Sequence, residues 1–71
     1  MTWERLRESE IKGTGSMLPA RMVLDYNDAE GTYRTFLETF TMSGETGFQY
    51  GRFFDTKDGV IEDFQNRATR L

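Results

Sequence analysis

The residue types that could carry chemistry in this chain are few. The sequence has no histidine and no cysteine. Their absence removes the commonest catalytic base, the thiolate nucleophile and the usual ligands for zinc, copper and nickel. A catalytic site would have to be built from carboxylates, lysine, tyrosine, serine or threonine. The sequence therefore predicts no catalytic, cofactor-binding or metal-binding residues, and a protein that is not an enzyme.

Paired aspartates are the arrangement in which acid–base chemistry could still be placed. Asp25 and Asp28 flank one expected turn, and Asp55 and Asp58 flank another. Two carboxylates can act as acid and base when burial separates their pKa values, so a small carboxylate-based hydrolase is a third functional hypothesis. Aspartates at turns more commonly bond to the neighbouring backbone, and neither pair has the register of a calcium-binding loop.

Aromatic residues and one arginine alternate in the stretch GFQYGRFF, residues 47–54. Exposed rings in such a strand stack on bases in several folds that bind single-stranded nucleic acids. Single-stranded nucleic-acid binding through Tyr50, Arg52 and their strand neighbours is therefore the alternative function. The stretch lacks surrounding lysines, however, and so small a protein needs these rings for its core.

Tryptophan, tyrosine and arginine are also the side chains that contribute most binding energy in protein–protein interfaces. The candidate partner-binding residues are Trp3, Tyr33, Tyr50, Arg52 and Phe54. The leading hypothesis is a small non-enzymatic binding or regulatory module that acts through protein–protein contact. Self-association, for example as a homodimer, is one form of that contact.

Length and charge narrow the possible partners. The 71 residues predict a single domain over residues 1–71, near the size at which one hydrophobic core barely offsets the entropy of ordering the chain. Nine basic and twelve acidic residues give a net charge of −3, which argues against a nucleic-acid partner because phosphate contacts need a basic surface. Residues 1–20 contain charges throughout and no apolar run, so we expect no signal peptide, no membrane span and a cytoplasmic location.

The segment from Thr32 to Asp55 holds seven of the ten aromatic residues and must build much of the core. In its first part, Tyr33, Phe36 and Leu37 begin an i, i+3, i+4, i+7 pattern that matches an amphipathic helix. The many threonines and aromatic residues favour a pleated strand instead, and hairpin-type turns lie on both sides. We predict a strand over Thr32–Met42, with a helix as the alternative.

The neighbouring segments predict two further strands, Met22–Asn27 and Phe48–Asp55, joined through the turns Asp28–Gly31 and Ser43–Gly47. Gly51 within the last strand suggests a bulge. The alternation there places Phe48, Tyr50, Arg52 and Phe54 on one face.

The two ends of the chain complete the expected fold. Val60–Leu71 has helical spacing, with acidic residues early and arginines late, and predicts a C-terminal helix. Met1–Lys12 predicts a short helix capped by Thr2, with a strand over Arg7–Lys12 as the alternative, and Gly13–Pro19 predicts a loop. The fold class is α+β: a small antiparallel meander of three to four strands with the helix on one face. The other face then needs Trp3 with the N-terminal segment, or a second copy of the chain, to cover it.

Overall fold

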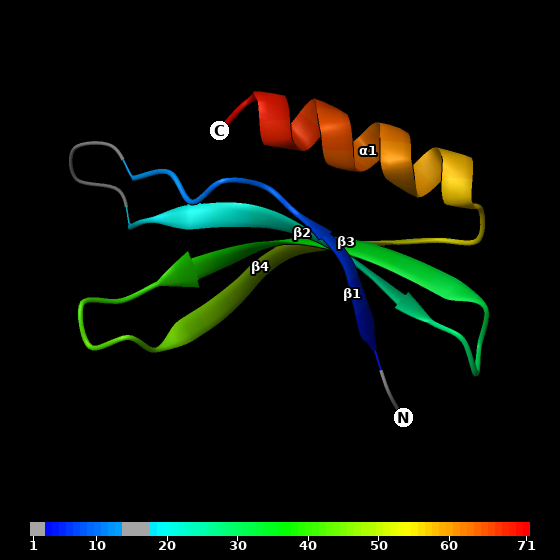
Figure 1. Cartoon of the computed structure of the whole chain (residues 1–71), viewed down its shortest axis with the longest axis horizontal. Coiled ribbons are helices and arrows are strands. Elements are labelled where there is room, and N and C mark those ends of the chain that lie inside the picture. The colour runs from blue at the N-terminus through cyan, green and yellow to red at the C-terminus, as the bar shows by residue number, and fades with distance from the viewer. Residues whose placement is uncertain (1–2, 14–17) are drawn as a thin grey trace.

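The computed structural model describes residues 3–13 and 18–71 as one sheet and one helix (Figure 1). The elements are β1 (Glu4–Glu8), β2 (Ala20–Asn27), β3 (Thr32–Phe40), β4 (Thr46–Phe54) and α1 (Lys57–Thr69). The predicted cap at Thr2 and most of the predicted loop Gly13–Pro19 lie outside the described residues.

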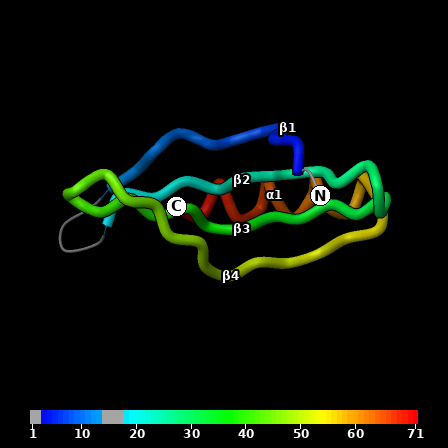
Figure 2. Tube along the Cα trace, turned by 90° about the horizontal axis from the view of Figure 1, so that it is seen from below, coloured from blue at the N-terminus to red at the C-terminus, as the bar shows by residue number. Residues whose placement is uncertain are grey.

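The four strands form an antiparallel meander in the order β1-β2-β3-β4. Figure 2 shows them side by side, with α1 behind β2 and β3 and no second helix or sheet in front among the described residues. We call the side away from α1 the open face. The predicted fold class is confirmed, with four strands.

The hairpin of β2 and β3 is the centre of the sheet. Their register pairs Met22 with Leu37 on the helix side and Val23 with Phe36 on the open face. The turn between them contains Gly31 at a φ of 65°, which suits glycine because it lacks a Cβ. The strand predicted over Thr32–Met42 is confirmed, ending at Phe40, and the helical alternative is wrong.

The main cluster of buried apolar side chains lies between α1 and the sheet, while Val23 and Phe36 are buried on the open face. The main cluster is formed by Met22 and Leu24 of β2 and by Val60 and Phe64 of α1, all buried. Half-buried apolar side chains pack around this centre: Tyr33, Leu37, Phe54, Ile61, Ala68 and Leu71. The predicted helix is therefore confirmed as the element that covers one face.

The bulge predicted in β4 is present. The register between β3 and β4 shifts between Thr35 and Leu37, so that Phe36 faces both Tyr50 and Gly51. Tyr50, not Gly51, adopts the left-handed conformation, with a φ of 57°. For a residue with a Cβ this conformation costs about 1 to 2 kcal/mol.

The bulge splits the aromatic face that the sequence predicts for β4, so that prediction is wrong. Phe48 pairs with Glu38 on the open face, whereas Arg52 and Phe54 pair with residues whose side chains point toward α1. One extra residue reverses the alternation, because side chains of a strand point to opposite faces in turn.

The short helix predicted near the N-terminus is also wrong. β1 is a strand whose five side chains are all exposed, and it begins before the alternative strand over Arg7–Lys12. It pairs with β2, and the pairing continues through Lys12, whose backbone exchanges two hydrogen bonds of 2.8 Å with Ala20. Backbone pairing with the edge of β2 therefore determines the structure of this segment, and a periodic pattern of apolar residues does not.

α1 begins earlier than its apolar pattern suggests, because Thr56 caps it. The Thr56 hydroxyl accepts a hydrogen bond of 3.2 Å from the Gly59 backbone N–H. We expect Thr56→Ala to lower the free energy of unfolding by about 1 kcal/mol, while Thr56→Ser leaves it nearly unchanged. Urea denaturation monitored by circular dichroism tests this, and equal stability of wild type and Thr56→Ala would contradict the assignment of the cap.

Candidate functional site

The open face carries two exposed aromatic rings of β4. Phe48 and Phe53 are 64% and 68% exposed. Phe36 of β3 is buried, and its ring contacts the Phe48 ring edge-on, with ring centroids 4.9 Å apart. Trp3 reaches across the sheet to Phe53, at a centroid distance of 6.3 Å.

An arginine links these rings into one row. The Arg34 guanidinium lies 4.0 Å from the centroid of the Trp3 ring and 5.1 Å from that of Phe36. Such cation–π contacts each stabilise by roughly 0.5 to 2 kcal/mol. We call Trp3, Phe36, Phe48 and Phe53, joined through Arg34, the aromatic row.

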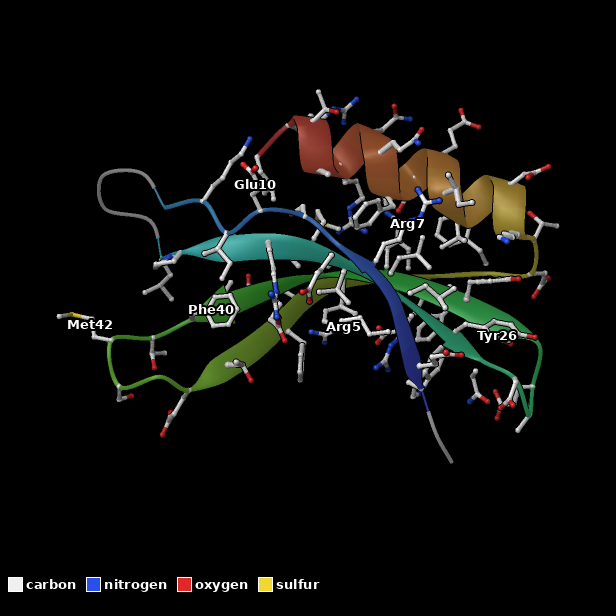
Figure 3. All side chains as sticks on the ribbon, viewed as in Figure 1. Arg5, Arg7, Glu10, Tyr26, Phe40 and Met42 are labelled. Carbon is white, nitrogen blue, oxygen red and sulfur yellow. The ribbon has the colours of Figure 1, made fainter. Side chains whose placement is uncertain are left out.

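The charges on the open face are balanced in pairs. Asp25 is only 3% exposed and accepts two hydrogen bonds from Arg34, of 3.0 and 2.9 Å. Glu38, also buried, accepts a bond of 2.7 Å from Arg21 and one of 3.5 Å from Arg5. Figure 3 shows Arg5 on this side of the sheet. Buried carboxylates need such partners, because an unpaired buried charge is strongly destabilising.

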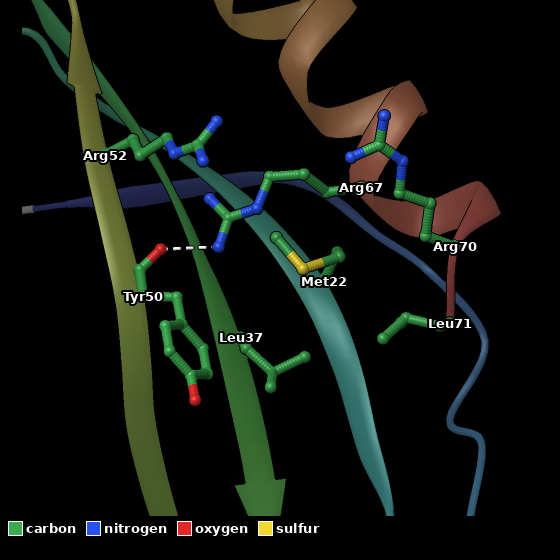
Figure 4. Close-up of a pocket in the computed structure, with 7 residues that line it drawn as sticks. All are labelled: Met22, Leu37, Tyr50, Arg52, Arg67, Arg70 and Leu71. Carbon is green, nitrogen blue, oxygen red and sulfur yellow. Dashed lines mark hydrogen bonds between the residues drawn. The ribbon is translucent and has the colours of Figure 1, made fainter.

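A cleft lies on the other side of the sheet, below the C-terminal end of α1 (Figure 4). Its volume is about 250 Å³. It is lined by Met22, Leu37, Tyr50, Arg52, Arg67, Arg70 and Leu71. The lining thus combines apolar side chains with three arginines and has no carboxylate side chain.

Arg67 forms the inner wall of this cleft. One of its Nη atoms donates to the Tyr50 carbonyl at 2.5 Å, and the other donates to the Thr35 hydroxyl at 3.0 Å. Asp63 accepts from the Thr35 hydroxyl at 2.6 Å and from Arg52 at 2.9 Å. This network joins α1 to β3 and β4 and holds the backbone of the bulge.

The five residues predicted to bind a partner do not form one site. Trp3 lies in the aromatic row on the open face, whereas Tyr33 and Phe54 are half-buried and pack against the core. Tyr50 and Arg52 line the cleft. The sheet separates Trp3 from the other four.

Sequence reasoning did not select Phe48, Phe53, Arg67 or Arg70 as site residues. The two phenylalanines were part of the aromatic alternation, but the bulge that places them together is a property of the folded strand pair. Arg67 and Arg70 are three apart on α1, and that spacing alone places them on one helix face.

The four aspartates considered for acid–base chemistry are dispersed. Asp25 is paired on the open face, and Asp58 lies in the first turn of α1. None of the four lines the cleft. Across residues 3–13 and 18–71, no cluster of three or more carboxylates is placed to hold a metal ion.

The part of the chain that the structure describes contains no helix with the length and apolar character needed to cross a bilayer. Comparison of the sequence and the fold with protein-family models, curated proteins and solved structures finds no match.

Proposed function

We propose that this protein is a small non-enzymatic binding module that acts through protein–protein contact at the open face, with a second copy of the chain as its partner. The observation that carries the proposal is the exposure of Phe48 and Phe53 on a sheet face that no second helix or sheet covers within residues 3–13 and 18–71. Large rings gathered on one exposed surface are typical of interaction sites.

The dimensions of the open face suit a modest dimer. Figure 2 views this face, whose sides correspond to the longest and shortest extents of the molecule, 37 and 16 Å. The rectangle of about 600 Å² bounded by these extents limits the projected area of the face, which is typical of small and weak interfaces. We therefore expect self-association at micromolar to millimolar concentrations.

The charges of the open face favour a second copy of the chain as the partner that binds there. Three arginines of this face are paired with three carboxylates: Arg5, Arg21 and Arg34 with Glu8, Asp25 and Glu38. The face is therefore close to neutral although the chain carries a net charge of −3. Two copies can meet there with little electrostatic repulsion.

Sedimentation equilibrium of the purified protein tests the proposal. We expect the average mass to rise from 8.3 kDa toward twice that value as the concentration increases. A mass that stays at 8.3 kDa up to millimolar concentrations would contradict self-association. If the protein instead binds a different protein through the open face, the proposed contact surface is retained and only the proposed partner is wrong.

Polar substitutions on the aromatic row are expected to abolish the dimer. In the double variant Phe48→Ser, Phe53→Ser, the dimer dissociation constant should rise at least about a hundredfold, because two interface rings are lost. Met42→Ser is the matched control, since Met42 is fully exposed at the tip of the β3–β4 hairpin (Figure 3). Equal effects of the double variant and the control would contradict a specific interface.

Single-stranded nucleic-acid binding stays an alternative proposal with weaker support. It relies on Tyr50 and Arg52, but the bulge places these residues on the helix side, away from Phe48. The open-face arginines are already paired with carboxylates. Titration with a fluorescent single-stranded oligonucleotide at low and high salt distinguishes the two functions, because phosphate-driven binding weakens steeply with salt.

A further inference from the structure

The arginines that line the cleft under the end of α1 differ in how many of their N–H groups already donate hydrogen bonds. The Arg67 side chain is 14% exposed and its Nη atoms are bonded to Thr35, Asp63 and Tyr50. The Arg52 side chain is 63% exposed and donates only from Nη1, to Asp63, within the described residues. Arg52 Nε and Nη2 are therefore available to a ligand.

Arg70 adds a second available guanidinium. It is exposed and lines the cleft, and no side-chain hydrogen bond or ion pair of Arg70 occurs among residues 3–13 and 18–71. Arginine offers paired N–H groups whose planar geometry matches carboxylate and phosphate oxygens.

The local charge is opposite to that of the whole chain. Three arginines line the cleft, and Asp63 behind them is the carboxylate paired with Arg52 and Arg67. Counting these four side chains gives a charge of about +2, in a chain whose net charge is −3. An acidic protein that places three arginines against one carboxylate in a concave site is arranged to attract an anion there.

The remaining lining of the cleft is apolar. Met22 at its base is buried, and Leu37 and Leu71 are half-buried beside it. The Tyr50 side chain is 71% exposed and adds an aromatic wall with a hydroxyl (Figure 4). The volume of about 250 Å³ is near the lower end of small-molecule binding sites, which suits a small ligand.

The backbone at the cleft is held in a strained conformation. Tyr50 has a φ of 57°, and Arg67 holds its carbonyl. Strained residues of this kind are concentrated at ligand-binding and active sites. Here the bulge directs the Tyr50 side chain into the cleft and not onto the open face.

We propose that this cleft binds a small amphiphilic anion, with a carboxylate or phosphate head on Arg52 and Arg70 and a short apolar tail over Met22 and Leu37. The site lies on the opposite side of the sheet from the aromatic row, because Met22 pairs with Leu37 on the helix side and Val23 with Phe36 on the open face. Anion binding and self-association are therefore separate properties that can fail independently.

Titration with octanoate and with octyl phosphate, followed by NMR, tests the site. We expect both probes to shift the Nε–H signals of Arg52 and Arg70 and the backbone signals of Tyr50 and Leu71. Octanol, which has the tail without the charge, and acetate, which has the head without the tail, should each bind at least about tenfold more weakly. Comparison of octanoate with octyl phosphate identifies the preferred head group.

Charge-removing variants locate the head group. Arg70→Gln and Arg52→Gln should each raise the octanoate dissociation constant about tenfold, because each removes charged hydrogen bonds. Lys57→Gln removes an equal charge at the other end of α1, about 20 Å from Arg70 along the helix axis, and should leave the octanoate dissociation constant unchanged. Arg70→Gln touches no ion pair of the described residues, so its folding should match that of the wild type in a thermal melt.

Two results would overturn the proposal. One is octanol binding as tightly as octanoate, which would identify an apolar cavity without anion recognition. The other is an octanoate dissociation constant that stays unchanged in both arginine variants, or that rises as much in Lys57→Gln as in those variants.

Discussion

Phe64→Ala is expected to remove most of the stability of the fold. Phe64 is buried against Met22 and Leu24, and truncation of a buried phenylalanine costs about 3 to 5 kcal/mol. A domain of this length has a total stability of about 4 to 10 kcal/mol. Urea denaturation followed by circular dichroism should therefore show a variant that is partly unfolded without denaturant, or that has a much lower midpoint.

Phe48→Ala is the matched control, because it makes the same substitution on the opposite side of the sheet. Phe48 is largely exposed in the single chain. The variant should change the free energy of unfolding by less than about 1 kcal/mol at protein concentrations too low for self-association. If Phe48→Ala lowers the free energy of unfolding as much as Phe64→Ala there, the cluster between α1 and the sheet is not the main source of stability.

Arg34→Leu is the second substitution with a large expected effect. It removes both hydrogen bonds of less than 3.1 Å to Asp25 and leaves Arg5, 3.7 Å away, as the nearest paired cation. It also removes the cation–π contacts with Trp3 and Phe36. We expect a loss of about 2 to 4 kcal/mol, since a buried carboxylate without its partner is strongly destabilising.

Adding Asp25→Leu to Arg34→Leu should restore much of that stability, because replacing both partners of a buried pair by apolar residues is close to neutral. The coupling energy from the double-mutant cycle measures the pair directly. Arg7→Leu serves as control, since Arg7 is exposed and no ion pair joins it to another described residue. A double variant whose loss equals the sum of the two single losses would show that Asp25 and Arg34 are not coupled.

Most of the fold could be predicted from local signals in the sequence. Threonine and aromatic residues gave β3 its strand character, Gly31 marked the hairpin, and the acidic-to-basic order along Val60–Leu71 marked α1. These signals act within a few residues, so they can be read without knowing what lies across the sheet.

The features that sequence reasoning missed depend on partners distant in the chain. β1 has no apolar period, and ion pairs of Arg5 with Asp25 and Glu38 help to fix it on β2. The left-handed residue in β4 is Tyr50 rather than the adjacent Gly51, and Arg67 of α1 bonds its carbonyl. Neither outcome follows from the local residue types.

The candidate sites were less predictable than the fold for the same reason. The sequence predicted that Trp3 with the N-terminal segment, or a second copy of the chain, would cover the second sheet face, and Trp3 does lie on that face. The cleft arginines come from β4 and from the end of α1, so their convergence depends on how the helix lies on the sheet. No spacing in the sequence specifies that placement.

The central claim is that two copies meet through the open face, and isotope-filtered NMR tests it most directly. The sample is an equal mixture of labelled and unlabelled protein at a concentration where the dimer dominates. The account predicts intermolecular NOEs from the Phe48 and Phe53 rings of one protomer to the open face of its partner. Intermolecular NOEs confined to α1 or to the hairpin tip at Met42, with none from the two rings, would contradict it.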